Sequence, residues 1–126
     1  MSKVMQNYEQ LAMATGLRLD RDRKMLYGLR EGFELLVYAA DERYPYWLTV
    51  SLSARSPMGA LGKDDYRLFV KNEKPVVSLV QEGNLIKMVL KNTPKQELLR
   101  NNLNYGIGAL LAFLRSKGFA RCCQLC

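Results

Sequence analysis

The chain contains no histidine among its 126 residues. This absence excludes histidine-based acid–base catalysis, serine–histidine and cysteine–histidine nucleophile pairs, and zinc sites with histidine ligands. Phosphate-binding loops are missing as well, because Gly28, Gly32, Gly59 and Gly62 match neither GxGxxG nor GxxxxGK(S/T). We therefore expect that the protein is not an enzyme.

Long hydrophobic runs are also missing. Residues 1–17 contain Gln6, Asn7 and Glu9 where a signal peptide needs an unbroken apolar core. The longest apolar run, Gly106 to Leu114, is far shorter than the roughly 20 residues that cross a bilayer. The sequence therefore predicts a cytoplasmic protein that does not bind a membrane.

Cysteine is absent until the last five residues, which contain Cys122, Cys123 and Cys126. Without a spaced cysteine framework, structural disulfides are not expected. Cys123 and Cys126 form a C-x-x-C, the spacing that lets two thiolates bind one Zn²⁺ from the same turn. A structural zinc site needs four ligands, so this chain provides a half-site of two ligands, or of three with Cys122.

Three explanations of this half-site are open. The chain is the front part of a longer protein whose continuation supplies another cysteine pair, or two copies share a metal across a dimer, or the thiols are redox-active or idle. We favour the first, and we interpret residues 119–126 as a tail that starts a zinc-binding or other downstream segment. Residues 1–118 are predicted to form a single domain.

The composition is that of a globular protein with a basic surface. Hydrophobic residues make up 48% and charged residues 25% of the chain, and the net charge is +7. The basic residues are scattered, and the tightest cluster, within residues 18–24, is interrupted by Asp20 and Asp22. We interpret this cluster as a solvated loop, with an anion site as the alternative.

Hydrophobic periodicity predicts a helix and three strands in the first half of the chain. Apolar residues recur at helical spacing over residues 4–13, and Gly16 ends the helix. Strand formers then fill Met25 to Arg30, Phe33 to Ala40 and Trp47 to Ala54. Their short connections predict an antiparallel meander.

The second half predicts a short helix, a β-hairpin and a long helix. The short helix is Lys63 to Asn72, and the strands are Val76 to Val80 and Leu85 to Lys91. The long helix covers residues 95–117. Its start is predicted from an N-cap, a first-turn proline and the capping-box spacing, which are provided by Thr93, Pro94 and Gln96.

The element order over residues 2–118 is therefore α-β-β-β-α-β-β-α, an α+β fold. This order resembles that of class I type III secretion chaperones and related small bacterial α+β domains. The stretch TGLRLDRDRKMLYGLREGFELLVYAA resembles their first helix end and opening hairpin. The resemblance implies a dimer that binds an extended polypeptide along the outside of the fold and performs no chemistry. It assigns no role to an individual residue.

Three sets of residues are candidates for binding a partner. Tyr46 and Trp47 lie in an aromatic cluster beside Arg43. Such a cluster can bind a peptide or stack on nucleic-acid bases. The alternative, which we favour, is that these side chains pack against a helix and cover the sheet edge. Leu110 and Leu114 make the end of the long helix apolar on more than one side. The polar strand faces form another candidate partner surface, which includes Thr49, Ser51, Ser53 and Lys87.

We expect a non-catalytic protein-interaction module that forms a homodimer and binds a protein or peptide. It is either chaperone-like or the N-terminal adaptor domain of a longer bacterial protein. The alternative is a nucleic-acid-binding domain that uses its basic surface together with a zinc knuckle completed elsewhere.

Overall fold

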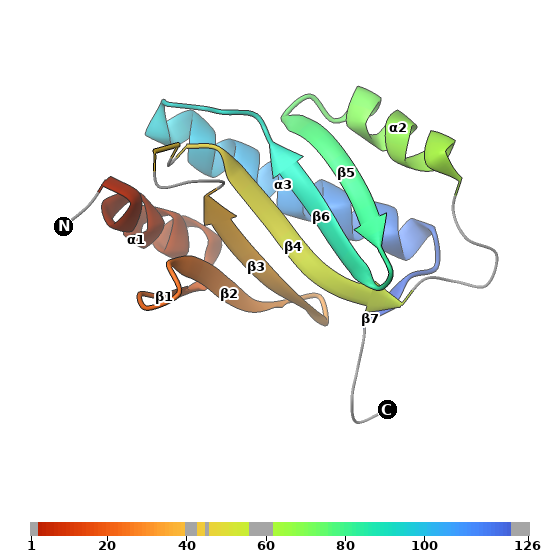
Figure 1. Ribbon diagram of the computed structural model, residues 1–126, viewed down its shortest axis with the longest axis horizontal. Helices are drawn as coiled ribbons and strands as arrows, with labels where there is room; N and C mark the ends of the chain where they lie inside the picture. The colour runs from red at the N-terminus through yellow and green to blue at the C-terminus, as the bar shows by residue number, and fades with distance from the viewer. Residues whose placement is uncertain (1–2, 40–42, 45, 56–61, 122–126) are drawn as a thin grey trace.

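The fold is that of a computed structural model, which describes residues 3–39, 43–44, 46–55 and 62–121. It confirms the α+β fold and the predicted order of the main elements (Figure 1). The elements are α1 (Lys3–Thr15), β1 (Arg18–Asp20), β2 (Met25–Arg30), β3 (Phe33–Ala39), β4 (Leu48–Arg55), α2 (Lys63–Asn72), β5 (Val76–Glu82), β6 (Leu85–Leu90), α3 (Gln96–Ser116) and β7 (Ala120–Arg121).

The strands form one antiparallel sheet in the order β1-β2-β3-β4-β6-β5, and β7 pairs with the end of β4. The turn between β2 and β3 has positive φ at both Glu31 (51°) and Gly32 (87°). Two such residues in succession match the right-handed twist of the flanking strands, so the turn closes the hairpin tightly. Strand β4 lies in the centre, between β3 and β6.

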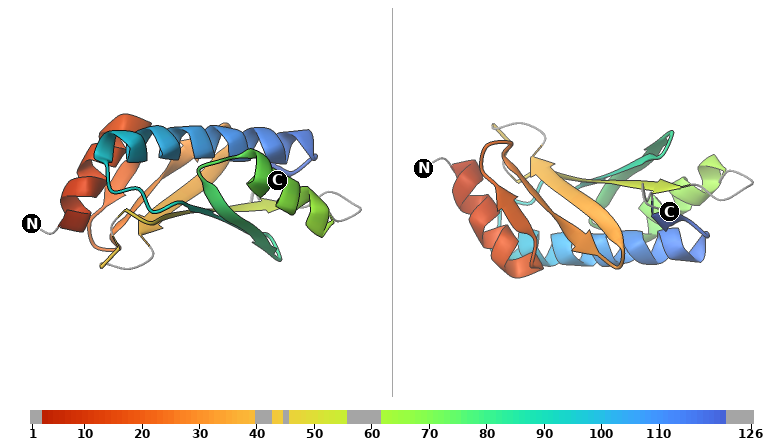
Figure 2. Two further views of the ribbon diagram at one scale, coloured as in Figure 1. Left: turned by 90° about the horizontal axis from the view of Figure 1, so that it is seen from above. Right: turned by 90° about the horizontal axis from the view of Figure 1, so that it is seen from below.

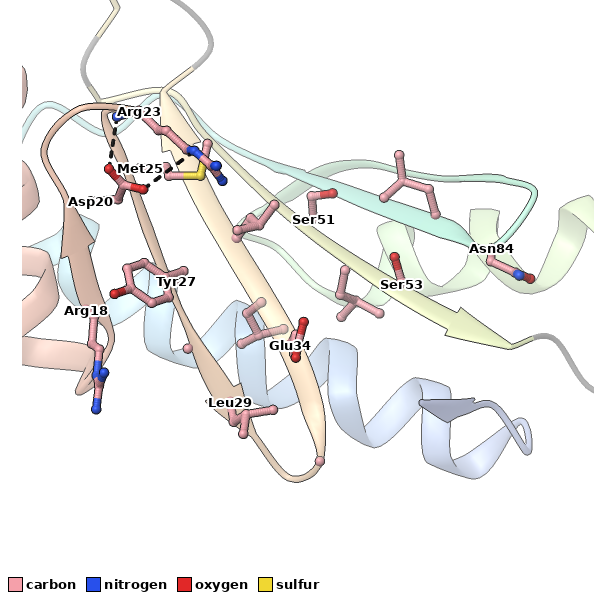
Figure 3. A pocket seen from close by; sticks show the side chains of 16 residues that line it. Arg18, Asp20, Arg23, Met25, Tyr27, Leu29, Glu34, Ser51, Ser53 and Asn84 are labelled. Atoms are coloured by element: carbon pink, nitrogen blue, oxygen red, sulfur yellow. Dashed lines mark hydrogen bonds and ion pairs between the residues drawn. The ribbon is translucent and has the colours of Figure 1, made fainter. Parts of the chain in front are cut away.

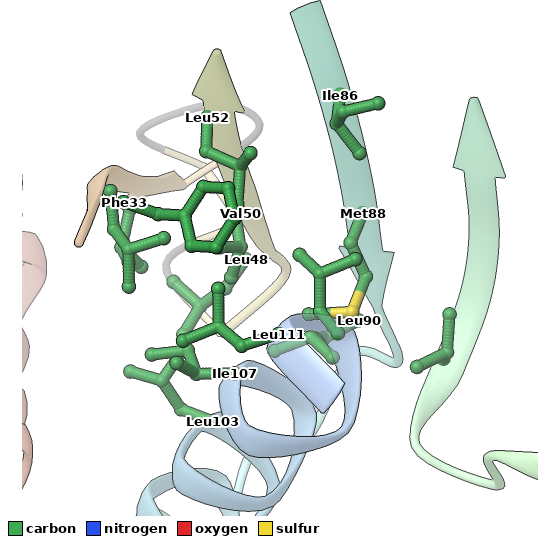
Figure 4. Close-up of a cluster of buried hydrophobic side chains, with 14 of the residues drawn as sticks. Phe33, Leu48, Val50, Leu52, Ile86, Met88, Leu90, Leu103, Ile107 and Leu111 are labelled. Carbon is green, nitrogen blue, oxygen red and sulfur yellow. The ribbon is translucent and has the colours of Figure 1, made fainter. Parts of the chain in front are cut away.

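Helices α1 and α3 cover one face of this sheet (Figure 2). Leu103, Ile107 and Leu111 of α3 point at the strands (Figure 4). The strands contribute fully or almost fully buried side chains to the same core, among them Val37, Leu48, Val50, Leu52, Ile86, Met88 and Leu90. Burial of this aliphatic face is the main stabilising contribution to the fold.

The helix α3 lies very close to β6 at Gly106. A Cβ atom at this position would lie 2.9 Å from Leu90 Cδ2 and 3.2 Å from Met88 Cε. The glycine thus removes the atom that would hold the helix away from the sheet. Gly108, two residues further on, has nothing within 4 Å of the corresponding position.

Helix α1 is fixed to the rest of the fold by polar contacts as well as by its apolar face. The buried Tyr8 hydroxyl accepts a hydrogen bond of 2.5 Å from the backbone N–H of Ala39, at the end of β3. The Thr15 hydroxyl donates to the Leu11 carbonyl at 2.7 Å and closes the last turn. Gly16 follows with a φ of +76°, as the predicted helix end requires.

Two local predictions are wrong. The N-cap of α3 is Lys95 and not Thr93. The Thr93 side chain is buried, and its hydroxyl donates to the Lys91 carbonyl and accepts a hydrogen bond from Asn102 Nδ2. Residues 18–20, which we interpreted as part of a solvated loop, pair with β2 as strand β1.

Candidate functional site: the open face of the sheet

The face of the sheet opposite α1 and α3 is left open by the described helices (Figure 2). Its side chains alternate with those of the core, because successive residues of a strand point to opposite faces. The pairing register aligns one row of these residues across six strands, from β1 to β5: Arg18, Tyr27, Leu36, Ser51, Lys87 and Val80.

A hollow of about 1070 Å³ lies in this face. Its lining comes from β1, β2, β3, β4 and the start of β6, as Figure 3 shows. Along β4 the floor consists of the small side chains Ser51 and Ser53, as the alternation in this strand predicted. Longer side chains of the neighbouring strands flank the floor, so the floor lies below its surroundings.

The walls of the hollow expose aliphatic surface. Leu29 of β2 is 67% exposed and Leu36 of β3 is 39% exposed, and Tyr27 lies beside Leu36 in the same row. Met25 and Leu85 add further apolar side chains to the lining. Large apolar side chains on adjacent strands at one concave surface are typical of an interaction site.

The Ser51 side chain lies at the centre of the floor. The residue is only 4% exposed, because Leu36 and Lys87 flank it on either side in the same row. Its hydroxyl has no hydrogen-bond partner in the part of the chain that the structure describes. A nearly buried hydroxyl at the bottom of a hollow is available to a ligand that carries a polar group.

Charges of both signs lie at the rim. Asp20 accepts hydrogen bonds from the backbone N–H groups of Asp22 (3.1 Å) and Arg23 (3.0 Å), and its carboxylate lies 3.8 Å from Arg23 Nε. Arg18 and Glu34, in contrast, form no ion pair or hydrogen bond through their side chains to another described residue. The hollow therefore has one available cation and one available anion.

The predicted aromatic cluster lies at the start of β4, outside the lining of the hollow. The Tyr44 and Trp47 rings form an edge-to-face pair at 6.2 Å, and the Arg43 guanidinium lies 5.7 Å from the centre of the Tyr44 ring. Tyr46 is partly buried against the core, and its carbonyl accepts the N–H of Thr93 at 3.2 Å. Trp47 remains partly exposed, so it retains surface for a partner.

Leu110 and Leu114, the candidate partner residues of the long helix, are fully buried in the core. The reason is that α3 is covered on two sides. The sheet covers one side, and α2 covers the other, where the Phe69 and Phe113 ring centres lie 4.9 Å apart. The apolar residues at the end of α3 therefore pack within the fold. Leu110 and Leu114 have no exposed surface that a partner could contact. This expectation is corrected.

The cysteines Cys122, Cys123 and Cys126 lie outside the described residues, so the zinc half-site stays a prediction. In the described ranges, no group of three or more acidic, cysteine or histidine side chains is placed to hold a metal ion. Over the same part of the chain, no helix has the length and apolarity that a membrane span requires.

Shifted ionisation occurs away from the hollow. Burial raises the pKa of Tyr8 and of Tyr66, and a hydrogen bond to Glu73 raises the pKa of Tyr105. None of these tyrosines lines the hollow. What the hollow offers is aliphatic surface, a free hydroxyl and two charges, a set suited to binding.

Reasoning from the sequence missed Tyr27, Leu29 and Leu36. The signal was present, because these residues alternate with the core residues Leu26 and Leu35 on neighbouring strands. The predicted partner surface rests on the polar residues of the open face and not on the apolar ones.

No protein-family model matches the chain, and no curated protein matches its sequence.

Proposed function

We propose that the protein is a non-catalytic interaction module that binds a protein or peptide partner in the hollow of its open sheet face. The observation that carries this proposal is the hollow itself, where exposed aliphatic side chains surround a floor of small residues. A chaperone-like or adaptor role in the cytoplasm is the biological setting that we propose for it.

The energetic support comes from Leu29 and Leu36. Fully burying one leucine side chain stabilises a complex by about 1.5–3 kcal/mol relative to leaving it in water, and the exposed fractions of Leu29 (67%) and Leu36 (39%) set the share of this that a partner can gain. Neither residue belongs to the hydrophobic core of the part of the chain that the structure describes. Their exposed apolar surface is therefore available to a partner. Tyr27 adds a large side chain with a hydroxyl, a combination common at binding hot spots.

We further propose that a second copy of the chain binds at the opposite end of the sheet. There α2 lies beside β5, the edge strand (Figure 1). Three exposed apolar residues lie on these two elements, Leu68 on α2 and Val77 and Val80 on β5. This end is separate from the hollow, so a dimer formed here leaves both hollows open.

Light scattering coupled to size-exclusion chromatography tests the dimer. We expect the mass of two chains for the wild type and of one chain for Leu68→Asp, because a carboxylate cannot be buried there without a partner. A wild-type monomer at high protein concentration would contradict the proposed dimer.

Nucleic acid is the alternative occupant of the open face. Proteins that bind single strands stack bases on several aromatic side chains in a basic groove. The hollow has one aromatic residue in its lining, Tyr27, and its other large side chains are mainly aliphatic. The composition of the lining therefore supports a protein or peptide partner.

A photo-crosslinking amino acid placed at position 36 tests the proposed function in the cells that make the protein. We expect covalent adducts to protein from position 36 and none from position 98, where Leu98 is similarly exposed on α3. Adducts from position 36 to nucleic acid would support the alternative. Equal yields from both positions would show that the hollow is not the binding surface.

A further inference from the structure

We infer that the occupant of the hollow is a short amphipathic α-helix that carries an acidic side chain opposite Arg18 and one polar side chain within its apolar stripe. This inference rests on the proposed function, and it adds the conformation and the side-chain chemistry of the partner. It differs from the extended polypeptide that the resemblance to secretion chaperones implies.

The length of the hollow sets the length of the helix. The lining extends over five neighbouring strands, from β1 to β6. Adjacent strands lie about 4.8 Å apart, so the four steps cover about 19 Å. At 1.5 Å per residue, a helix of about 13 residues crosses this distance. Such a helix has between three and four turns and presents four or five apolar side chains on one stripe.

The conformation follows from hydrogen bonding. The backbone groups of β2, β3 and β4 are already paired within the sheet, so the open face offers only side chains to its occupant. An extended segment lying on this face would leave its own N–H and C=O groups unpaired against leucine side chains, which is costly. A helix satisfies its backbone internally and buries only its apolar stripe.

The small floor allows the helix to approach β4. Ser51 and Ser53 leave room between the side chains of β3 and β6, into which a side chain of the crossing helix fits. The nearly buried Ser51 hydroxyl would lose water when a helix covers it. A polar side chain in the stripe, such as asparagine or serine, restores the hydrogen bond, and a fully aliphatic stripe does not.

The unpaired charges fix the direction of the helix. Arg18 lies on β1, at one end of the hollow, and Glu34 lies on β3, the middle one of the five strands that line it. A helix with an acidic residue at its β1 end and a basic residue near its middle pairs with both groups in one orientation. The reversed helix keeps its basic residue near Glu34 but leaves Arg18 without an acidic partner, so Arg18 favours one of the two directions.

Two display libraries of peptides of about 14 residues test this inference on the full chain. One library places apolar residues at helical spacing, and the other places them at every second position. Each is selected on the wild-type protein, and the affinity of each selected peptide is then measured by fluorescence anisotropy. The variants are Leu36→Asp, Arg18→Glu and the control Leu98→Asp on the helix-covered side of the molecule.

The expected result is binding from the helical library and a gain of helical circular dichroism in the peptide. Leu36→Asp should weaken this binding about 30-fold or more, the size of a hot-spot truncation, while Leu98→Asp leaves it unchanged. Arg18→Glu, at an exposed site, should weaken it about two- to fivefold, and a charge-reversing substitution in the peptide should restore it.

The contradicting outcomes separate the two levels of the proposal. Selection only from the alternating library, still sensitive to Leu36→Asp, overturns the helix and leaves the proposed function intact. Selected peptides whose binding is insensitive to both Leu36→Asp and Arg18→Glu overturn both. Preferential binding of a single-stranded oligonucleotide that competes with the peptide and weakens steeply with salt also overturns both.

Discussion

The two faces of the sheet are built from the same strands but have different chemistry. In β4, Leu48, Val50 and Leu52 point at α3 and are buried almost completely, while Ser51 and Ser53 point at the hollow. In β2 and β3 the open face also carries exposed aliphatic side chains, namely Leu29 and Leu36. The helix-covered face is thus almost entirely apolar, and the open face combines small, aliphatic and charged residues.

This difference separates what the fold needs from what it leaves available. Stability comes from the helix-covered face, where removal of any large side chain leaves a cavity. The aliphatic residues of the open face contribute little to folding while they remain in contact with water. Their presence is therefore best explained by a partner, and substitutions on the two faces should affect different properties.

The largest contrast is expected between Leu103→Ala in α3 and Leu36→Ser in β3. Leu103 is fully buried, so its truncation should lower the free energy of unfolding by about 2–5 kcal/mol. Leu36→Ser should lower it by no more than about 1 kcal/mol. Urea denaturation followed by circular dichroism measures both. Similar losses for the two variants would mean that the open face also stabilises the fold.

Tyr8→Phe should have the next largest effect. The substitution leaves the Ala39 N–H without its acceptor, at a cost of about 1–3 kcal/mol. Tyr27→Phe removes a hydroxyl from the open face and serves as the control, with an expected change near zero. An equal effect of the two substitutions would show that the Tyr8 contact does not stabilise α1 against the sheet.

The same residue predicts a dependence on pH. Burial raises the pKa of Tyr8 above its ordinary value of 10.0, so the folded chain holds this proton more tightly than the unfolded chain. The contribution to stability is complete below pH 10.0 and decreases as the pH rises through the folded pKa. Unfolding free energies measured across this range should fall more steeply for the wild type than for Tyr8→Phe.

The glycines of α3 give a smaller, paired test. Gly108→Ala should raise the free energy of unfolding by up to about 1 kcal/mol, because alanine favours the helix and the position is open. Gly106→Ala should lower it by about 1 kcal/mol, since the added methyl group meets Leu90 and Met88 in the core. Thermal unfolding measures both variants. If both were more stable than the wild type, the close approach of α3 to β6 would be contradicted.

The smallest effect is expected for Arg115→Ala. Arg115 Nη1 lies 2.8 Å from Glu31 Oε1, and this ion pair joins α3 to the β2–β3 turn at the surface. Exposed pairs contribute about 0.2–1 kcal/mol, and the contribution decreases with salt. A loss above this range that persists in high salt would show that the pair does more than join two exposed side chains.

The sequence predicted the order of the main elements because alternation and helical periodicity were clear in them. The faces of β4 were predicted correctly residue by residue, since leucine, valine and alanine alternate with serine and threonine. Strand β1 was missed because its three residues are flanked by charges and gain their place only by pairing with β2. The roles of Thr93, Leu110 and Leu114 depend on tertiary packing, which local patterns do not report.

The candidate site was predictable in part. The polar floor was expected as a partner surface from the alternation in β4 and β6. The hollow was not, because it results from the register that aligns Leu36 with Tyr27 and Ser51 across the sheet. Register over three strands depends on which residues pair, and the sequence of one strand does not contain this information.

We propose that partners bind on the open face of the sheet and not on its helix-covered side. Amide chemical-shift mapping by NMR tests it most directly, with the isotope-labelled protein titrated with the peptide selected from the helical library. We expect shifts in β2, β3 and β4 around Leu36 and Ser51, with α1 and the exposed side of α3 unchanged. Shifts confined to α1, to α3 or to the aromatic cluster at Trp47 would contradict it.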